Sequence, residues 1–138
     1  MKRLISAAGL FTVLASTTYS YGQTSVVQAD VPFPFQVGET TMPAGKYILR
    51  ESGVLLTVRG EAGKPAVMIL TSPTEHRSKS SRSSLAFERY DSDSFLTNIW
   101  EGGSRNGRAL PKSKREKELA RRVTFGHTEE VALQTNSH

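Results

Sequence analysis

Short apolar runs separated by turn residues fill the chain between Val26 and Trp100, and this spacing limits the fold more than any other feature. The runs recur at the interval of ~8–12 residues that is typical of antiparallel sandwiches and barrels. No stretch with helical periodicity separates them, which argues against a parallel α/β fold. The sequence therefore predicts a mainly β protein, a small antiparallel β-sandwich or barrel of about 6–8 strands.

The first predicted strand has the alternation that is expected when one face of a sheet is buried. Phe33, Phe35 and Val37 alternate with Pro34 and Gln36, and because Pro cannot donate a ladder hydrogen bond, an edge strand or strand entry is expected here. Further strands are predicted over Lys46–Arg50, Val54–Arg59, Ala66–Thr71, Ser84–Tyr90 and Ser94–Trp100. The second and third of these are nearly all apolar, which is typical of central strands covered on both faces.

The rest of the chain does not follow the strand pattern. Residues 72–84 form a Ser-rich, basic stretch and are predicted to be an exposed loop. Ser113 and Glu116 match a capping box, in which the Ser oxygen accepts a bond from the amide three residues on and the Glu reaches back. We therefore predict one short C-terminal amphipathic helix over 113–123, followed by a disordered tail over 124–138.

The N-terminal residues have the layout of a secretory signal. Lys2 and Arg3 precede the apolar run Leu4–Ala15, and small residues then predict a cut before Gln23, with a cut nearer Ala15 as the alternative. The apolar run is shorter than the ~20 residues that span a bilayer, so a retained N-terminal anchor is the less favoured interpretation. We expect a signal peptide over 1–22 and an exported mature protein, periplasmic or extracellular.

Charge and cysteine content narrow the function classes. The chain of 138 residues has no Cys, which excludes a disulfide scaffold, a Cys-based zinc site and a thiol nucleophile. Its formal net charge of +5 is uneven, because residues 105–122 hold 8 basic and 2 acidic side chains while residues 23–104 hold 8 basic and 9 acidic ones. A single β-rich domain over 23–123 is expected, held together by packing alone.

Several segments resemble a known group of proteins. The pattern V-P-F-x-F-x-V-G followed by L-P-A-G-x-Y is matched by Phe33–Gly38 and Met42–Tyr47, with Met42 where Leu is usual. Later matches are Leu85–Tyr90, Phe95–Trp100, Gly107–Ser113 and Glu116–Ala120. The chain thus resembles, from Val31 to Ala120, a group of small exported β-proteins of acidobacteria and other soil bacteria. The resemblance implies an exported β-protein and carries no activity, substrate or catalytic residue.

Catalytic and metal-binding motifs have little support in the sequence. His76, His127 and His138 are far apart and lack ligand spacing, so solvent-exposed imidazoles are favoured over a metal site or a general base. Asp91 and Asp93 lack the other positions of a calcium loop, so a turn is favoured. Neither G-x-S-x-G nor S-x-x-K with its partner motifs is present. We predict no catalytic residue, no metal and no cofactor, and a hydrolase with an unrecognised site is the least favoured alternative.

One candidate binding site remains, in the basic segment. Gly102, Gly103 and Gly107 lack the ending of a phosphate-binding loop, so a flexible loop is favoured there. If this loop and the predicted helix share a face, they form a basic patch of Arg105, Arg108, Lys112, Lys114, Arg115, Arg121 and Arg122. Such a patch can bind an anionic envelope or extracellular polymer, and export makes nucleic acid the least natural partner. A solvated helix face is the alternative.

The aromatic residues on the predicted strands leave a second possibility open. Tyr47, Tyr90, Phe95 and Trp100 are expected in the core, although aromatic side chains on strands can also line a ligand cavity. The leading expectation is an exported, non-enzymatic β-domain with a binding or structural role at the envelope, and not an integral membrane protein. The alternative is a small β-barrel that binds an apolar ligand.

Overall fold

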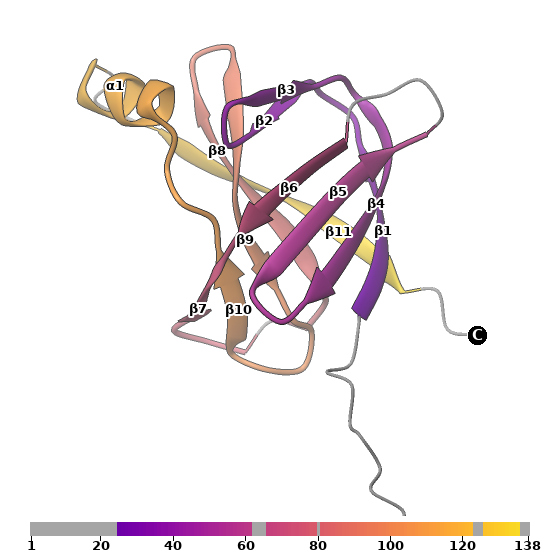
Figure 1. Cartoon of the computed structure of the whole chain (residues 1–138). Helices are drawn as coiled ribbons and strands as arrows, with labels where there is room; N and C mark the ends of the chain where they lie inside the picture. Colours follow the sequence, from indigo (N-terminus) through magenta and orange to yellow (C-terminus); the bar gives the residue numbers. More distant parts are fainter. Residues whose placement is uncertain (1–24, 62–65, 80, 123–125, 136–138) are drawn as a thin grey trace, which may run out of the picture.

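A computed structural model describes residues 25–61, 66–79, 81–122 and 126–135, so the predicted signal peptide over 1–22 lies outside the described residues. Within these ranges the fold is mainly β with one short helix, which confirms the predicted class (Figure 1). In chain order the elements are β1 (Ser25–Val31), β2 (Phe35–Val37), β3 (Thr40–Met42), β4 (Gly45–Ser52), β5 (Leu55–Gly60), β6 (Ala66–Leu70), β7 (Ser72–Glu75), β8 (Ser84–Tyr90), β9 (Asp93–Trp100), β10 (Asn106–Ala109), α1 (Lys114–Arg122) and β11 (His127–Thr135).

The strands form one nearly closed, barrel-like sheet. Hydrogen-bonded neighbours run in the order β3-β2-β9-β8-β11-β1-β4-β5-β6. β10 pairs with both β9 and β7, and β7 follows β6 after the single residue Thr71, so the circuit returns from β6 to β9. Of the two predicted architectures the barrel is therefore the observed one, and the 11 strands of the described residues exceed the predicted number.

The predicted disordered tail is wrong for the part of 124–138 that the structure describes. β11 lies between β8 and β1, with Val131 opposite Leu85 and Leu133 opposite Ala29. Val131 and Leu133 pack against the core, so this strand supplies one side of the barrel wall. The sequence of β11 has few apolar residues and an acidic first half, so it does not resemble a strand. The hydrogen bonds that order β11 come from β1 and β8, which are distant in the sequence.

Two other segments also differ from their predictions. β6 ends the strand path instead of lying at its centre, and the side chains of Met68 and Leu70 are 65% and 64% exposed. β7 occupies the beginning of the predicted loop over 72–84, where its backbone pairs with β10 although its side chains are mostly exposed. Apolar content alone therefore overstated the burial of β6 and missed β7, whose pairing depends on backbone groups.

The barrel interior is filled around a cluster of aromatic rings. Phe35 lies edge-on to Tyr47 and to Phe87, with ring centroids 5.1 and 5.3 Å apart. All three side chains are at most 2% exposed, and the Tyr47 hydroxyl donates to the carbonyl of Pro43. Burial of each such ring stabilises the fold by about 1.5–3 kcal/mol. Tyr47 and Phe35 therefore anchor the core, as predicted for Tyr47.

The helix α1 lies outside the barrel (Figure 1), and its Arg115 lies 3.1 Å from Asp93 at the start of β9. The amide of Glu116 donates to Ser113 Oγ at 3.1 Å, which confirms the first half of the predicted capping box. Within the described residues, Glu116 Oε1 is buried without a hydrogen-bond partner, so its carboxylate does not complete the box through that oxygen. Burial raises the pKa of Glu116, opposed by Lys112 and reinforced by Glu88. The last residue of the predicted helix, Val123, lies outside the described residues.

Candidate binding pocket at the barrel mouth

A pocket of about 390 Å³ opens at one end of the barrel. Its lining includes residues of β10, the end of β9, and Pro73 on β7. Figure 1 shows β7 and β10 at the end of the molecule that lies away from α1. We call this site the mouth pocket.

One wall of the mouth pocket is apolar. Val27 on β1, Ile99 on β9 and Leu133 on β11 line it. Ile99 belongs to the core cluster, and Val27 and Leu133 pack against that cluster, so these side chains point toward the barrel interior. Adjacent strands β11 and β1 and the opposite strand β9 thus place an apolar surface at the inner end of the pocket.

An ion pair lies across the same pocket. Arg108 on β10 faces inward because it stands opposite the buried Ile99, and Glu51 on β4 stands opposite the buried Leu56. Arg108 Nε lies 3.5 Å from Glu51 Oε2, and the two side chains are 29% and 22% exposed. This separation is longer than the ~2.7–2.9 Å of a charge-assisted hydrogen bond. The pair is therefore loose, and the guanidinium keeps donors that can turn to another acceptor.

The tryptophan at the end of β9 forms a further wall. Gly107 stands opposite Trp100, and a Cβ added at Gly107 would lie 2.4 Å from Trp100 Cε3, so glycine is required for this close approach. The ring of His76 meets the Trp100 ring edge-on at a centroid distance of 4.9 Å. These contacts fix the indole beside the pocket. Trp100 is thus only partly buried and borders a cavity, whereas Tyr90 and Phe95 are buried as predicted.

The polar loops around the pocket are braced by their own hydrogen bonds. Ser83 Oγ accepts a bond from the amide of Gly102 at 3.0 Å, and the Ser104 hydroxyl donates to Glu101 Oε2 at 3.3 Å. Arg105 Nε donates to the carbonyl of His76 at 3.0 Å. These groups hold the rim in place, and the inward-facing Arg108 is the cation available to a ligand.

The predicted basic patch is divided between two places. Arg105 and Arg108 lie at the mouth end, near the β9–β10 turn, whereas α1 lies at the other end of the molecule (Figure 1). The helix end carries Lys112, Lys114, Arg115, Arg121 and Arg122. Arg115 is paired there with Asp93 at 3.1 Å, and Arg108 is paired in the pocket. The loop and the helix do not share a face, so the seven side chains do not form one surface.

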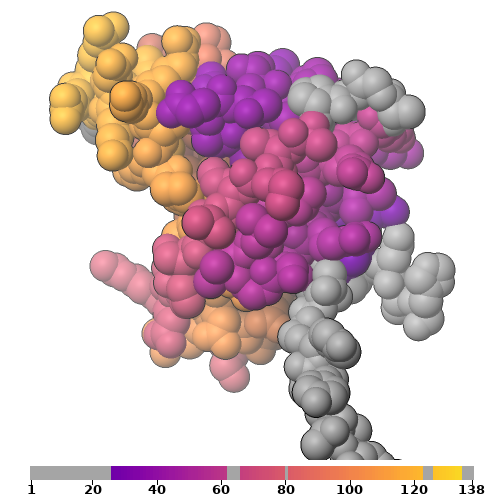
Figure 2. Space-filling view, in the orientation of Figure 1, coloured from indigo at the N-terminus to yellow at the C-terminus, as the bar shows by residue number. Residues whose placement is uncertain are grey.

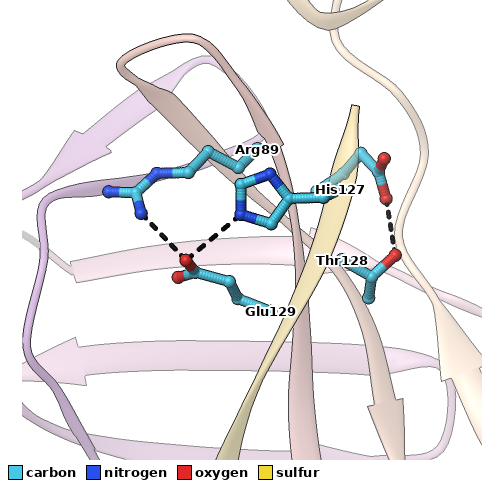
Figure 3. A network of polar contacts seen from close by, with 5 residues as sticks. Arg89, His127, Thr128 and Glu129 are labelled. Atoms are coloured by element: carbon cyan, nitrogen blue, oxygen red, sulfur yellow. Dashed lines mark hydrogen bonds and ion pairs between the residues drawn. The ribbon is translucent and has the colours of Figure 1, made fainter. Parts of the chain in front are cut away.

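The polar network at the opposite end of the barrel is a brace for the fold (Figure 3). Glu129 Oε1 lies 2.9 Å from Arg89 Nη1 and 3.3 Å from His127 Nε2. The Arg89 guanidinium also stands over the Phe33 ring, 5.4 Å from its centroid. The nearby Thr128 hydroxyl donates to Glu88 at 3.0 Å, and no hydroxyl is bonded to His127 among the described residues. The network joins β8 to β11 through the Arg89–Glu129 ion pair and the Thr128–Glu88 hydrogen bond.

The described ranges contain neither a cluster of metal ligands nor a helix suited to span a membrane. There, no three His, Asp or Glu side chains cluster so that they could hold a metal ion. His76 is exposed, and Asp91 lies in the β8–β9 turn with a φ of 54°, a conformation that Asp tolerates. No described helix has the length and apolar character that a membrane crossing requires.

Arg108 and Trp100 are candidate residues in the sequence, but the site that they share is not evident there. Glu51 and Leu133 complete it from β4 and from a segment that was predicted to be disordered. The inward direction of Arg108 follows from the β10–β9 register, which the sequence does not reveal. Comparison of the chain with protein-family models, curated proteins and solved structures found no match.

Proposed function

We propose that this protein is an exported, non-enzymatic binding protein whose mouth pocket takes a small amphipathic molecule with an acidic head group. One observation carries the proposal: Arg108 faces inward at 29% exposure, loosely paired at 3.5 Å, beside an apolar wall. A half-buried guanidinium attracts a carboxylate more strongly than an exposed one does, because less water screens the pair. The acidic group would join or replace Glu51 at Arg108, and the apolar part would lie against Val27 and Leu133.

Pocket size and composition support a small ligand. The volume of about 390 Å³ is at the lower end of the range for small-molecule sites. Such sites combine apolar walls with a few polar groups that orient the ligand. The mouth pocket has this composition, with Ile99 and Trp100 on its walls, the Arg108–Glu51 pair and a second carboxylate from Glu101.

Export is the second part of the proposal, and it rests on the N-terminal sequence. Lys2 and Arg3 before the apolar run Leu4–Ala15 are typical of a secretory signal. Expression in a bacterial host should place the protein in the periplasm or medium, with Gln23 as its first residue by intact mass. A full-length chain retained in the cytoplasm would contradict export.

The ligand class is tested with decanoate and its neutral counterpart decanol in titration calorimetry. We expect decanoate to bind, and Arg108→Gln to weaken that binding about 10- to 100-fold, the effect of losing a hydrogen bond to a charged group. Decanol binding should be weaker in the wild type and unchanged by Arg108→Gln. Glu51→Gln removes the competing carboxylate, so it should tighten decanoate binding on the order of tenfold.

The matched control is Arg105→Gln, which removes the same charge from the rim but not from the pocket lining. It should leave the affinity for decanoate unchanged. No decanoate binding by the wild type, or an equal loss in both arginine variants, would contradict the proposal. Preserved thermal unfolding of each variant shows that any loss is not caused by unfolding.

A further inference from the structure

The outer side of strands β1, β4, β5 and β6 carries exposed apolar side chains that the mouth pocket does not explain. Leu56 and Val58 on β5 are buried, so their neighbours Leu55, Thr57 and Arg59 point outward. Leu70 stands opposite Leu55 and Met68 opposite Thr57 in the β5–β6 ladder. Residues opposite one another in an antiparallel ladder share a face, so Met68 and Leu70 lie on this outward side.

The same side extends across β4 to β1. Val26 stands opposite Arg50, and Ile48 stands opposite both Gln28 and Arg59. Met68, Leu70, Ile48 and Val26 are 65%, 64%, 44% and 38% exposed. Exposed apolar side chains that are scattered singly over a surface are ordinary, whereas several on one sheet face are typical of an interaction site. We call this surface, made of Val26, Lys46, Ile48, Arg50, Leu55, Arg59, Met68 and Leu70, the outer face.

Cationic side chains are interleaved with the apolar ones. Lys46, Arg50 and Arg59 are exposed, and among the described residues none of them takes part in an ion pair. The facing carboxylates are at one end: Asp30 stands opposite Lys46, and Asp30 and Glu61 line a small pocket of about 280 Å³ with Lys46. The remainder of the face, from Arg50 to Leu70, combines positive charge with apolar surface.

We propose that the outer face docks the protein on an anionic lipid surface. In such a surface the cations meet lipid phosphates, and the ends of Ile48, Met68 and Leu70 enter the boundary between head groups and acyl chains. Figure 2 shows β5 and β6 turned toward the viewer, and in this view no other described element covers them. Lys and Arg suit this position because their apolar stems can lie along the surface while the charges reach phosphates.

Charge and burial favour a lipid surface over the other possible occupants. A second copy docked by the same face would bring two sets of three unpaired cations together, which is unfavourable. An anionic polysaccharide would neutralise Arg50 and Arg59 but would leave Met68 and Leu70 in water. A bilayer with anionic head groups satisfies both requirements, and its planar geometry needs no groove.

The test is co-sedimentation with phosphatidylcholine vesicles that contain either no phosphatidylglycerol or about 30% of it. Phosphatidylglycerol supplies the anionic head groups that attract a basic protein surface. We expect binding only to the anionic vesicles, weakening as salt rises. Lys46→Gln, Arg50→Gln and Arg59→Gln together should weaken binding on the order of a hundredfold. Met68→Ser with Leu70→Ser should weaken it roughly tenfold.

The matched control removes the same charge from the helix, with Lys117→Gln, Arg121→Gln and Arg122→Gln. It should bind within about threefold of the wild type, since those side chains lie away from the outer face. Every sample has the same N-terminus, so differences between variants report on the replaced side chains. Equal losses in the two triple variants, or no effect of the Met68 and Leu70 changes, would overturn the proposal.

Two further results would also overturn it. Equal binding of the wild type to both vesicle types, or binding to neither, would exclude an anionic lipid surface as the occupant. A concentration-dependent dimer that disappears with Met68→Ser and Leu70→Ser, measured by analytical ultracentrifugation, would assign the face to a second copy. Arg108→Gln should leave vesicle binding unchanged, so this test is independent of the mouth pocket.

Discussion

Two arginine–glutamate pairs face inward at the two ends of the barrel, and they differ in length and surroundings. Arg89 and Glu129 approach to 2.9 Å, and the guanidinium is also held over the Phe33 ring. Arg108 and Glu51 are 3.5 Å apart and border the mouth pocket. A short pair with a second contact restrains its partners, whereas a long pair beside a cavity leaves its donors available. The first pair is therefore structural and the second is suited to a ligand.

Glu116 gives a prediction of pH-dependent stability. Burial raises its pKa in the folded protein, with Lys112 opposing and Glu88 reinforcing the shift. The folded state then holds this proton more tightly than the unfolded state, so the contribution to stability is full below the unfolded-state pKa. That contribution is lost as the pH rises through the folded-state pKa. Glu116→Gln should therefore be more stable than the wild type at neutral pH, on the order of 1 kcal/mol.

Urea unfolding at several pH values between about 4 and 8 tests the direction of this difference in stability between Glu116→Gln and the wild type. The advantage of Glu116→Gln should shrink toward the acidic end, where the wild-type carboxyl is protonated in both states. Glu118→Gln on the exposed side of the same helix is the control and should show no such pH dependence. A Glu116→Gln protein that is less stable than the wild type at neutral pH would show that the buried carboxylate is stabilising.

The secondary-structure elements that could be predicted from the sequence are those that depend on residues close together in the chain. The Asp91–Asp93 turn, the helix start at Ser113 and the strands around Leu85 and Ile99 all form where expected. β7 and β11 were missed because their order comes from pairing with strands distant in the chain. β6 was placed at the centre of the sheet because an apolar run does not reveal which neighbour is absent.

The contribution of β11 to the core can be tested at Leu133. Leu133 faces the core and the mouth pocket, whereas its neighbour Gln134 is exposed. Leu133→Ala should lower the free energy of unfolding by about 1–3 kcal/mol, because a partly buried methyl pair is lost and little can refill the space. Gln134→Ala should change it by less than about 0.5 kcal/mol. Equal effects in urea unfolding would mean that β11 does not contribute to the core.

For the whole molecule, the barrel separates two chemically different surfaces. The mouth pocket has one inward cation beside apolar walls, and the outer face has three outward cations among exposed apolar side chains. The predicted basic patch is divided because β10 carries Arg108 into the barrel and Arg105 lies beside it in the β9–β10 turn, while the chain after β10 carries Lys112 and the later cations to α1. Charge counting along the sequence locates the cations but cannot tell their directions, which depend on register.

The fluorescence of the single tryptophan of the chain provides the sharpest test of ligand binding in the mouth pocket. Trp100 lines the mouth pocket and is the only tryptophan in the sequence. Selective excitation of tryptophan therefore gives an emission that reports on whether the pocket is occupied. Titration with decanoate should shift or quench the emission with the same dissociation constant as calorimetry, and Arg108→Gln should weaken both about 10- to 100-fold. Decanoate binding that leaves the Trp100 emission unchanged, or that is insensitive to Arg108→Gln, would place the ligand elsewhere and exclude the mouth pocket as its site.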